Sequence, residues 1–180
     1  GKDLPKSEFE EIKENVWVSK KAIIFPSVHI EGPTIIQANA QIRHCAFIRG
    51  GAIVGENAVV GNSTEIKNVI LFNDVQVPHF NYVGDSVLGY KAHLGAGAIT
   101  SNVKSDKSEI DIKINGEKIS TGLKKFGAIL GDHAEVGCNV VLNPGTMLGR
   151  NTSVYPTSMV RGVVEENSIF KNSGQIIKKF

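Results

Sequence analysis

Aliphatic residues return at every sixth position over the first part of the chain. The series comprises Val18, Ile24, Ile30, Ile36, Ile42, Ile48, Val54, Val60 and Ile66, and Phe72 extends it. A helix advances by about 100° per residue, so a step of six places no single apolar stripe on it. In an extended chain the side chains alternate, so every sixth residue faces the same side. The pattern therefore predicts a stack of short parallel strands, each with one aliphatic side chain turned inward.

Small residues stand two places before most members of the series, where they would fill the narrow space beside the aliphatic column. They are Ala22, Thr34, Ala40, Ala46, Ala52, Ala58 and Thr64. A second regular block follows, with Leu130, Val136, Leu142, Leu148, Val154 and Val160, and its register also includes Leu88 and Leu94. The two registers do not match, because Phe72 and Leu88 are two residues short of three hexads apart. Breaks in a consistent pattern tend to be functional or strained, so segment 73–87 is a candidate site.

The flanking segments divide the chain further. Ser7 and Glu10 form a possible capping box, which predicts a short helix over 5–14 within an N-terminal helical or irregular segment, 1–17. The repeat domain is expected over 18–165 and a C-terminal tail over 166–180. Inside the domain, the polar segment 101–126 interrupts the hexads, and alternating residues around Asn115–Gly116 predict a protruding hairpin.

Composition narrows the class of protein. With 180 residues, 41% of them hydrophobic, and 19 glycines for tight corners, the chain suits one domain or one repeat array. A net charge of +2 is too mild to argue for binding to nucleic acid or to a membrane, and we expect neither as a partner. Cys45 and Cys138 form neither a disulfide framework nor a metal-type pair, which favours a reduced, cytoplasmic setting. The N-terminus lacks a signal-peptide core, and Gly1 in place of methionine suggests a processed tag or an excised domain.

Residues three hexads apart should stack at about 4.8 Å, the spacing between strands. Arg49 and Lys67 fall in one such column, with Glu31 below them. Two stacked cations repel by about 1 kcal/mol even in water. Either Glu31 and solvent compensate for this repulsion, or the two cations form an anion site in which a phosphate turns repulsion into affinity.

His79 stands in segment 73–87, between Pro78 and Phe80, and could act as a base near neutral pH. A structural or surface role for the same histidine is the alternative. The other histidines are scattered over both blocks, and we expect no converging trio of imidazoles and no metal site.

Two segments, PHFNYVGDSVLG at 78–89 and LGAGAITSNV at 94–103, are distinctive enough to indicate a resemblance to a known family. Over roughly residues 16–165, the chain resembles the acetyltransferase domain of bacterial N-acetylglucosamine-1-phosphate uridyltransferase/glucosamine-1-phosphate acetyltransferase. It is also similar to the equivalent domain of archaeal bifunctional sugar-1-phosphate nucleotidylyltransferases. The resemblance implies an all-β fold, a left-handed parallel β-helix of hexapeptide repeats, and a homotrimer. The family's nucleotidyltransferase domain has no counterpart in the sequence.

The resemblance also implies roles for individual residues. His79 matches the family's general base, and Ala96 the position whose backbone amide faces the thioester. On the substrate side, Arg49 and Lys67 match the phosphate ligands, Tyr82 a further sugar-phosphate ligand, Glu65 an acidic position near the site, and Asn102 an asparagine of the amino-sugar pocket. His93 stands where the family has a substrate-binding asparagine, and Lys104 or Lys124 would supply the loop lysine. Cys138 and Pro156 fall at positions near the coenzyme, together with Ala96.

These matches imply an acetyl-CoA-dependent N-acetyltransferase acting on an amino-sugar 1-phosphate, most simply glucosamine 1-phosphate. Its place would be in the synthesis of nucleotide-sugar precursors. One alternative is a degenerate β-helix domain that oligomerises, or binds a sugar nucleotide, beside a nucleotidyltransferase; the changes at 93, 103 and 155–156 favour it. Another is an acetyltransferase for a different acceptor, with a pocket reshaped by His93 and the hairpin.

Overall fold

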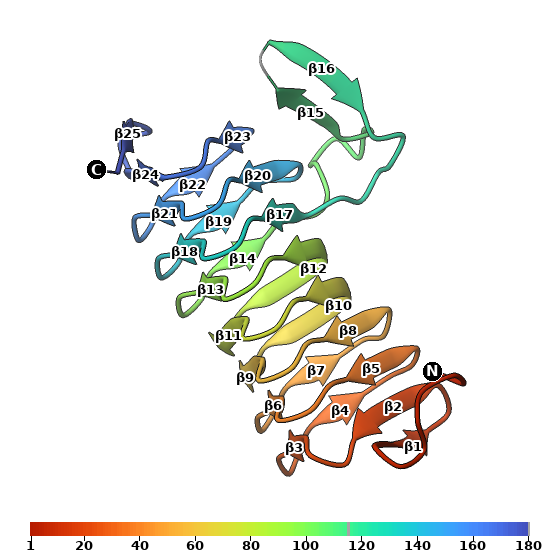
Figure 1. The fold of residues 1–180 in the computed structure, drawn as a ribbon. Helices are drawn as coiled ribbons and strands as arrows, with labels where there is room; N and C mark the ends of the chain where they lie inside the picture. Colours follow the sequence, from red (N-terminus) through yellow and green to blue (C-terminus); the bar gives the residue numbers. More distant parts are fainter. Residues whose placement is uncertain (115, 180) are drawn as a thin grey trace.

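The chain winds into a parallel β-solenoid, as the hexads predict. The computed structural model describes residues 1–114 and 116–179. Each turn of the coil contributes one short strand to each of three faces, and the turns stack along one axis (Figure 1). The predicted fold class is confirmed, since nearly all strand pairs are parallel and the described residues include no helix.

We number the faces 1, 2 and 3. Face 1 consists of β2 (Val16–Ser19), β5 (Thr34–Ile36), β8 (Ala52–Val54), the second halves of β10 (Glu65–Leu71) and β12 (Tyr82–Leu88), β17 (Ala128–Leu130), β20 (Thr146–Leu148) and β23 (Val163–Val164). Face 2 consists of β4 (His29–Ile30), β7 (Phe47–Ile48), the first halves of β10 and β12, β14 (Ile99–Thr100), β19 (Val141–Leu142) and β22 (Met159–Val160). Face 3 consists of β3 (Ile23–Ile24), β6 (Gln41–Ile42), β9 (Val59–Asn62), β11 (Gln76–His79), β13 (His93–Leu94), β18 (Glu135–Val136), β21 (Ser153–Val154) and β24 (Ser168–Phe170).

The core is the aliphatic column inside the coil. Members of the hexad series from Ile36 to Ile66, and those of the second block, are almost completely buried. Ile24 is an exception at 37% exposure, because β3 is the outermost strand of face 3 and no described strand pairs with its outer edge. Burial of one large aliphatic side chain is worth about 1.5–3 kcal/mol, so repetition over the turns stabilises the long coil.

The register break differs from the prediction. Phe72 does not continue the core series: Leu71 is buried, whereas Phe72 is 50% exposed. The two-residue deficit is split into two single deletions, between Ile66 and Leu71 and between Val83 and Leu88. The shortened turns let β10 and β12 run as seven-residue strands from face 2 onto face 1. His79 therefore lies in a regular hexad, and both deletions lie at the corner that carries Lys67 and Asp85.

The N-terminal helix prediction is wrong. Residues 9–13 form β1 (Phe9–Lys13), which pairs antiparallel with β2 and buries Phe9. An isolated helix as short as 5–14 is marginal in water, whereas pairing satisfies the exposed edge of the first turn. At the other end the coil continues past residue 165 through β24, and β25 (Ile176–Lys178) covers it by antiparallel pairing.

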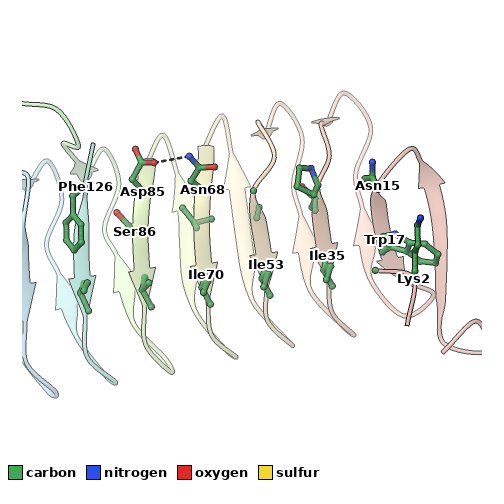
Figure 2. Close-up of a pocket in the computed structure, with 18 residues that line it drawn as sticks. Lys2, Asn15, Trp17, Ile35, Ile53, Asn68, Ile70, Asp85, Ser86 and Phe126 are labelled. Carbon is green, nitrogen blue, oxygen red and sulfur yellow. Dashed lines mark hydrogen bonds between the residues drawn. The ribbon is translucent and has the colours of Figure 1, made fainter. Parts of the chain in front are cut away.

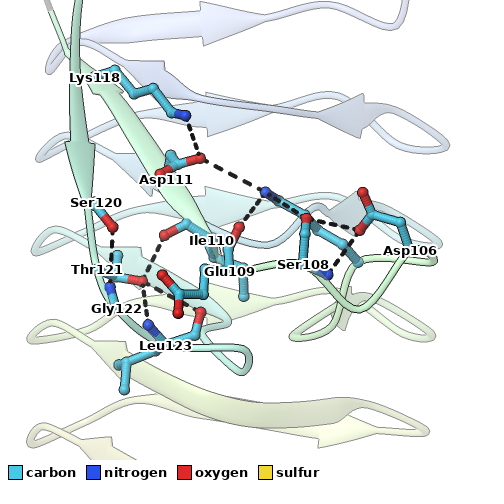
Figure 3. Close-up of polar contacts among 11 residues, drawn as sticks. Asp106, Ser108, Glu109, Ile110, Asp111, Lys118, Ser120, Thr121, Gly122 and Leu123 are labelled. Atoms are coloured by element: carbon cyan, nitrogen blue, oxygen red, sulfur yellow. Dashed lines mark hydrogen bonds and ion pairs between the residues drawn. The ribbon is translucent and has the colours of Figure 1, made fainter.

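A hairpin protrudes from the coil after β14, as predicted for segment 101–126. It consists of β15 (Asp111–Ile114) and β16 (Glu117–Ser120), while Asn115 lies outside the described residues. Its base is held by polar contacts (Figure 3): Lys104 bonds the Glu109 carbonyl, and Lys118 pairs with Asp111 at 3.0 Å. Ile110 is fully buried and lies beside Gly145, so the base is packed onto the coil.

Candidate active site

Face 2 lies between the two corners that carry the predicted site residues. The chain enters it from face 3 at the histidine corner, a column formed by Asn62, His79, Ala96, Cys138 and Pro156. It leaves toward face 1 at the arginine corner, formed by Arg49, Lys67, Asn68, Gly84, Asp85 and Asn102. Tyr82 and Glu65 lie on face 2 between the corners, side by side in the register of β10 and β12.

The histidine corner is a regular ladder of backbone hydrogen bonds. Each turn of the coil forms one rung of this ladder. In each rung, the residue that follows the column position donates its N–H to the carbonyl of the column residue one turn below. The bonds are Phe80 to Asn62 at 2.9 Å, Gly97 to His79 at 3.0 Å, Asn139 to Ala96 at 2.8 Å and Thr157 to Cys138 at 2.9 Å. His79, Ala96, Cys138 and Pro156, assigned separately from the sequence, therefore lie in one line along the corner.

Ala96 presents a free backbone donor beside His79. Within the described residues its N–H donates to no protein acceptor, whereas the N–H groups of Gly95, Gly97 and Ala98 are all bonded. The side chain of His79 is exposed and forms no hydrogen bond or salt bridge with any described residue. An accessible imidazole therefore lies one rung from an amide that can donate to a developing negative charge.

At the arginine corner, the positive charge of Arg49 is stabilised by a neighbouring carboxylate. Arg49 donates to Glu65 at 2.8 Å, and this hydrogen bond, ahead of the charges of Tyr82 and Glu31, raises the pKa of Arg49. The guanidinium stays charged at any physiological pH. Lys67 stacks on Arg49 and forms no salt bridge within the described chain. Compensation of Arg49 therefore comes mainly from Glu65 rather than from Glu31, whose carboxylate is 3.5 Å from His29.

Asp85 gathers the polar side chains at this corner. One of its carboxylate oxygens accepts from Asn68 at 2.9 Å and the other accepts from Asn102. The amide of Asn102 also donates to the Tyr82 hydroxyl at 3.3 Å. Gly84 keeps the space open, because a Cβ there would lie 2.7 Å from the Tyr82 hydroxyl and 2.8 Å from the Asn102 amide. The single-residue deletion before Leu88 places this cluster at the edge of face 2.

His93 is separated from the other substrate-binding candidates within one chain. It lies on face 3, and its Nδ1 is 2.9 Å from a carboxylate oxygen of Glu135. It lines a cavity of about 360 Å³ with Asp74, Lys91 and His133. The structure thus brings Arg49, Lys67, Glu65, Tyr82 and Asn102 together and leaves His93 on a neighbouring face.

Residues 1–114 and 116–179 contain no group of three or more His, Cys, Asp or Glu side chains arranged to hold a metal ion. They also contain no helix long and apolar enough to cross a membrane.

Sequence reasoning assigned no role to two polar residues near the site. Asp85 stands at the second deletion, which the sequence alone does not locate. Asn81 is 3% exposed and occupies the inward column otherwise held by Ala46, Thr64 and Ala98. An amide at a position that the hexads reserve for small residues was the available signal.

Comparison with known proteins gives consistent matches. Residues 30–126 match the family described as GMPPB C-terminal domain. The chain is 36% identical over 135 residues to the bifunctional protein GlmU of Methanococcus vannielii, covering 74% of this chain and 32% of the relative. It is 33% identical over 166 residues to the bifunctional sugar-1-phosphate nucleotidylyltransferase/acetyltransferase of Sulfurisphaera tokodaii, covering 89% of this chain and 41% of the relative. The chain thus spans less than half the length of these two relatives.

Two other matches cover more of the compared protein. The uncharacterized acetyltransferase YaiX of Escherichia coli O6:K15:H31 is 34% identical over 173 residues, covering 86% of this chain and 72% of the relative. The crystal structure of a hexapeptide transferase family protein from Anaplasma phagocytophilum superimposes with a TM-score of 0.55 at 17% identity. That alignment covers 92% of this chain and 80% of the other, and it supports the fold.

Proposed function

The chain belongs to the GMPPB C-terminal domain family, and from this premise we propose that it is a sugar N-acetyltransferase. The proposed reaction moves an acetyl group from acetyl-CoA to the amine of an amino-sugar 1-phosphate, most simply glucosamine 1-phosphate. The observation that carries the proposal is the layout of face 2, with a cation pair at one corner and an accessible histidine beside a free amide at the other. Two of the relatives are named as acetyltransferases, which supports the same reaction class.

The arginine corner would bind the phosphate. Arg49 and Lys67 stack one rung apart, and a phosphate between them would accept charge-assisted hydrogen bonds from both. Tyr82 would add a hydroxyl donor, and Asn102, fixed by Asp85, would line the sugar pocket. Arg49 would donate hydrogen bonds to Glu65 and to the substrate phosphate at the same time.

The histidine corner would carry the chemistry. The substrate amine attacks the thioester carbonyl, and His79 accepts the proton that the nitrogen loses. The Ala96 N–H donates to the tetrahedral oxyanion, a contact worth about 3 kcal/mol. Collapse of this intermediate breaks the carbon–sulfur bond, and His79 returns the proton to the leaving thiolate. The line of Ala96, Cys138 and Pro156 would guide acetyl-CoA along the corner.

A homotrimer would complete the coenzyme groove between neighbouring chains. Support comes from face 1, whose outward residues form an apolar stripe that includes Trp17, Ile35, Ile53 and Ile70 (Figure 2). Ile53 and Ile70 are each about two-fifths exposed, and the stripe lines a groove of about 590 Å³. Contiguous exposed apolar surface of this kind marks a protein interface. Ile53→Lys with Ile70→Asp should then yield a smaller species in sedimentation; an unchanged mass would exclude face 1 as the interface.

Thiol release from acetyl-CoA tests the activity. Glucosamine 1-phosphate should support turnover, and glucosamine, which lacks the phosphate, should support much less at equal concentration. A panel of other amino-sugar phosphates and nucleotide-linked amino sugars covers the alternative acceptor class. Absence of thiol release with every acceptor, from folded protein, would overturn the proposal.

The second candidate is a non-catalytic β-helix domain that oligomerises or binds a sugar nucleotide. It is favoured by the position of His93, which pairs with Glu135 on face 3 instead of facing the Tyr82 cluster. This candidate predicts saturable binding of a sugar nucleotide, measured by calorimetry, without release of thiol from acetyl-CoA.

A further inference from the structure

Asn81 connects the two groups that the proposed reaction needs most. Asn81 is buried inside the coil, at the end of the short corner segment 79–81 that begins with His79. Its side-chain oxygen accepts the N–H of His79 at 3.1 Å. Its side-chain nitrogen donates to the carbonyls of Gly95 at 2.8 Å and Ala98 at 3.1 Å.

The two bonds to carbonyls hold the tight turn 95–98, which carries the free N–H of Ala96. Gly95 and Ala98 are the first and last residues of that turn, with Ala96 between them. The middle of the turn is also tied to His79, because Gly97 donates to the His79 carbonyl. The turn is thus fixed to the histidine rung at three points, two of which are made by Asn81.

The same column in neighbouring rungs shows that the fold does not require an amide there. Ala46 lies two rungs below and Ala98 one rung above, and both are buried. Thr64, one rung below, is a smaller buried residue whose hydroxyl donates to the Val77 carbonyl. A buried amide costs several kcal/mol unless its groups are paired. Among the residues that the structure describes, the side-chain amide of Asn81 is paired only with His79 and with the turn that carries Ala96, so it couples these two groups in addition to filling space.

We propose that Asn81 is a positioning residue that sets the placement of the His79 imidazole relative to the Ala96 N–H. The inference rests on the proposed function and deepens it. Misplacement of reacting groups by about 1 Å can lower the rate a hundredfold, so loss of the Asn81 amide should strongly reduce turnover.

The test uses Asn81→Ala in the full chain, with Thr152→Ala as matched control. Thr152 is fully buried, and its single hydroxyl proton is shared between two carbonyls on a different corner, Gly149 at 2.7 Å and Glu165 at 3.2 Å. Both variants should lose a similar amount of thermal stability. Asn81→Ala should lower kcat by about a hundredfold and leave the Kd of glucosamine 1-phosphate within about twofold, because the phosphate is held at the arginine corner. Thr152→Ala should retain kcat.

Two readouts separate positioning from a purely structural role. Hydrogen exchange of the Gly97 amide should accelerate in Asn81→Ala and not in Thr152→Ala, whether or not substrate is present. In Asn81→Asp, an ionised carboxylate cannot donate to Gly95 or Ala98, whereas the protonated acid donates to one of them. Burial raises the pKa of such a carboxyl, so the ratio of variant to wild-type kcat should rise as the pH falls.

The outcomes distinguish the two levels of inference. An active wild-type chain together with unchanged kcat in Asn81→Ala overturns the positioning role alone. A parallel loss of kcat, substrate affinity and stability in both variants also overturns it, because the effect would then be structural. A wild-type chain that releases no thiol overturns the proposed function and, with it, this inference.

Discussion

The two corners of face 2 are built by different means. The histidine corner keeps regular hexads, and its ladder of backbone bonds places one residue of every turn in line. The arginine corner loses one residue in each of two successive turns, and the side-chain bonds of Asn68 and Asn102 to Asp85 add to its backbone bonds. A regular corner can present a main-chain amide reproducibly. A shortened corner draws side chains from adjacent turns into one cluster.

The largest expected effect is at the regular corner. His79→Ala should lower kcat by about a hundredfold to ten-thousandfold, because general-base catalysis contributes that much. The Kd of glucosamine 1-phosphate should change little, since the phosphate contacts are at the opposite corner. Steady-state kinetics and calorimetry measure the two quantities; a folded variant with wild-type kcat would remove His79 from the mechanism.

The shortened corner can be tested through stability. Leu71→Ala should lower the free energy of unfolding by about 2–5 kcal/mol, because it empties a filled core position. Phe72→Ala should change it by no more than about 0.5 kcal/mol, since the Phe72 side chain is half exposed. Urea denaturation of both variants compares them. A larger loss of stability in Phe72→Ala than in Leu71→Ala would show that Phe72, and not Leu71, occupies the core position of the hexad series.

The phosphate role of the arginine corner predicts a split between acceptors. Arg49→Ala should raise the KM for a phosphorylated acceptor by about ten- to a hundredfold, because a hydrogen bond to a charged group contributes about 1.5–3 kcal/mol. The KM for the corresponding neutral sugar should stay the same. Equal increases for both acceptors would exclude a phosphate contact at Arg49.

The smallest expected effect concerns the space at Gly84. Gly84→Ala should displace the Tyr82 hydroxyl and the Asn102 amide, which are the ends of movable side chains. We expect a three- to tenfold rise in KM, about the worth of one hydrogen bond, with little change in kcat. A change in kcat with unchanged KM would place this cluster closer to the reacting atoms than to the phosphate.

The deletions explain why the sequence located the break only roughly. Leu71 and Phe72 are both apolar, so either residue could end the first register, and the distance from Ile66 to Leu88 is two residues short of four hexads in both cases. The choice between them is made by packing: Leu71 stacks on Val54 inside the coil, which leaves Phe72 outside. The same ambiguity placed His79 within the break, although its own hexad from Val77 to Val83 is intact.

Sequence alone determined the solenoid, the hairpin and the stacking of Arg49 with Lys67. Strand alternation and turn preference are local properties, and they repeat at a constant period along the chain. Tertiary structure decided the pairing of Arg49 with Glu65, the separation of His93 from Tyr82, and the bonds of Asn81 to the next turn. Contacts between turns depend on the summed length of every turn between them. One deleted residue changes all the pairings that follow, and only the packed coil shows where that residue is missing.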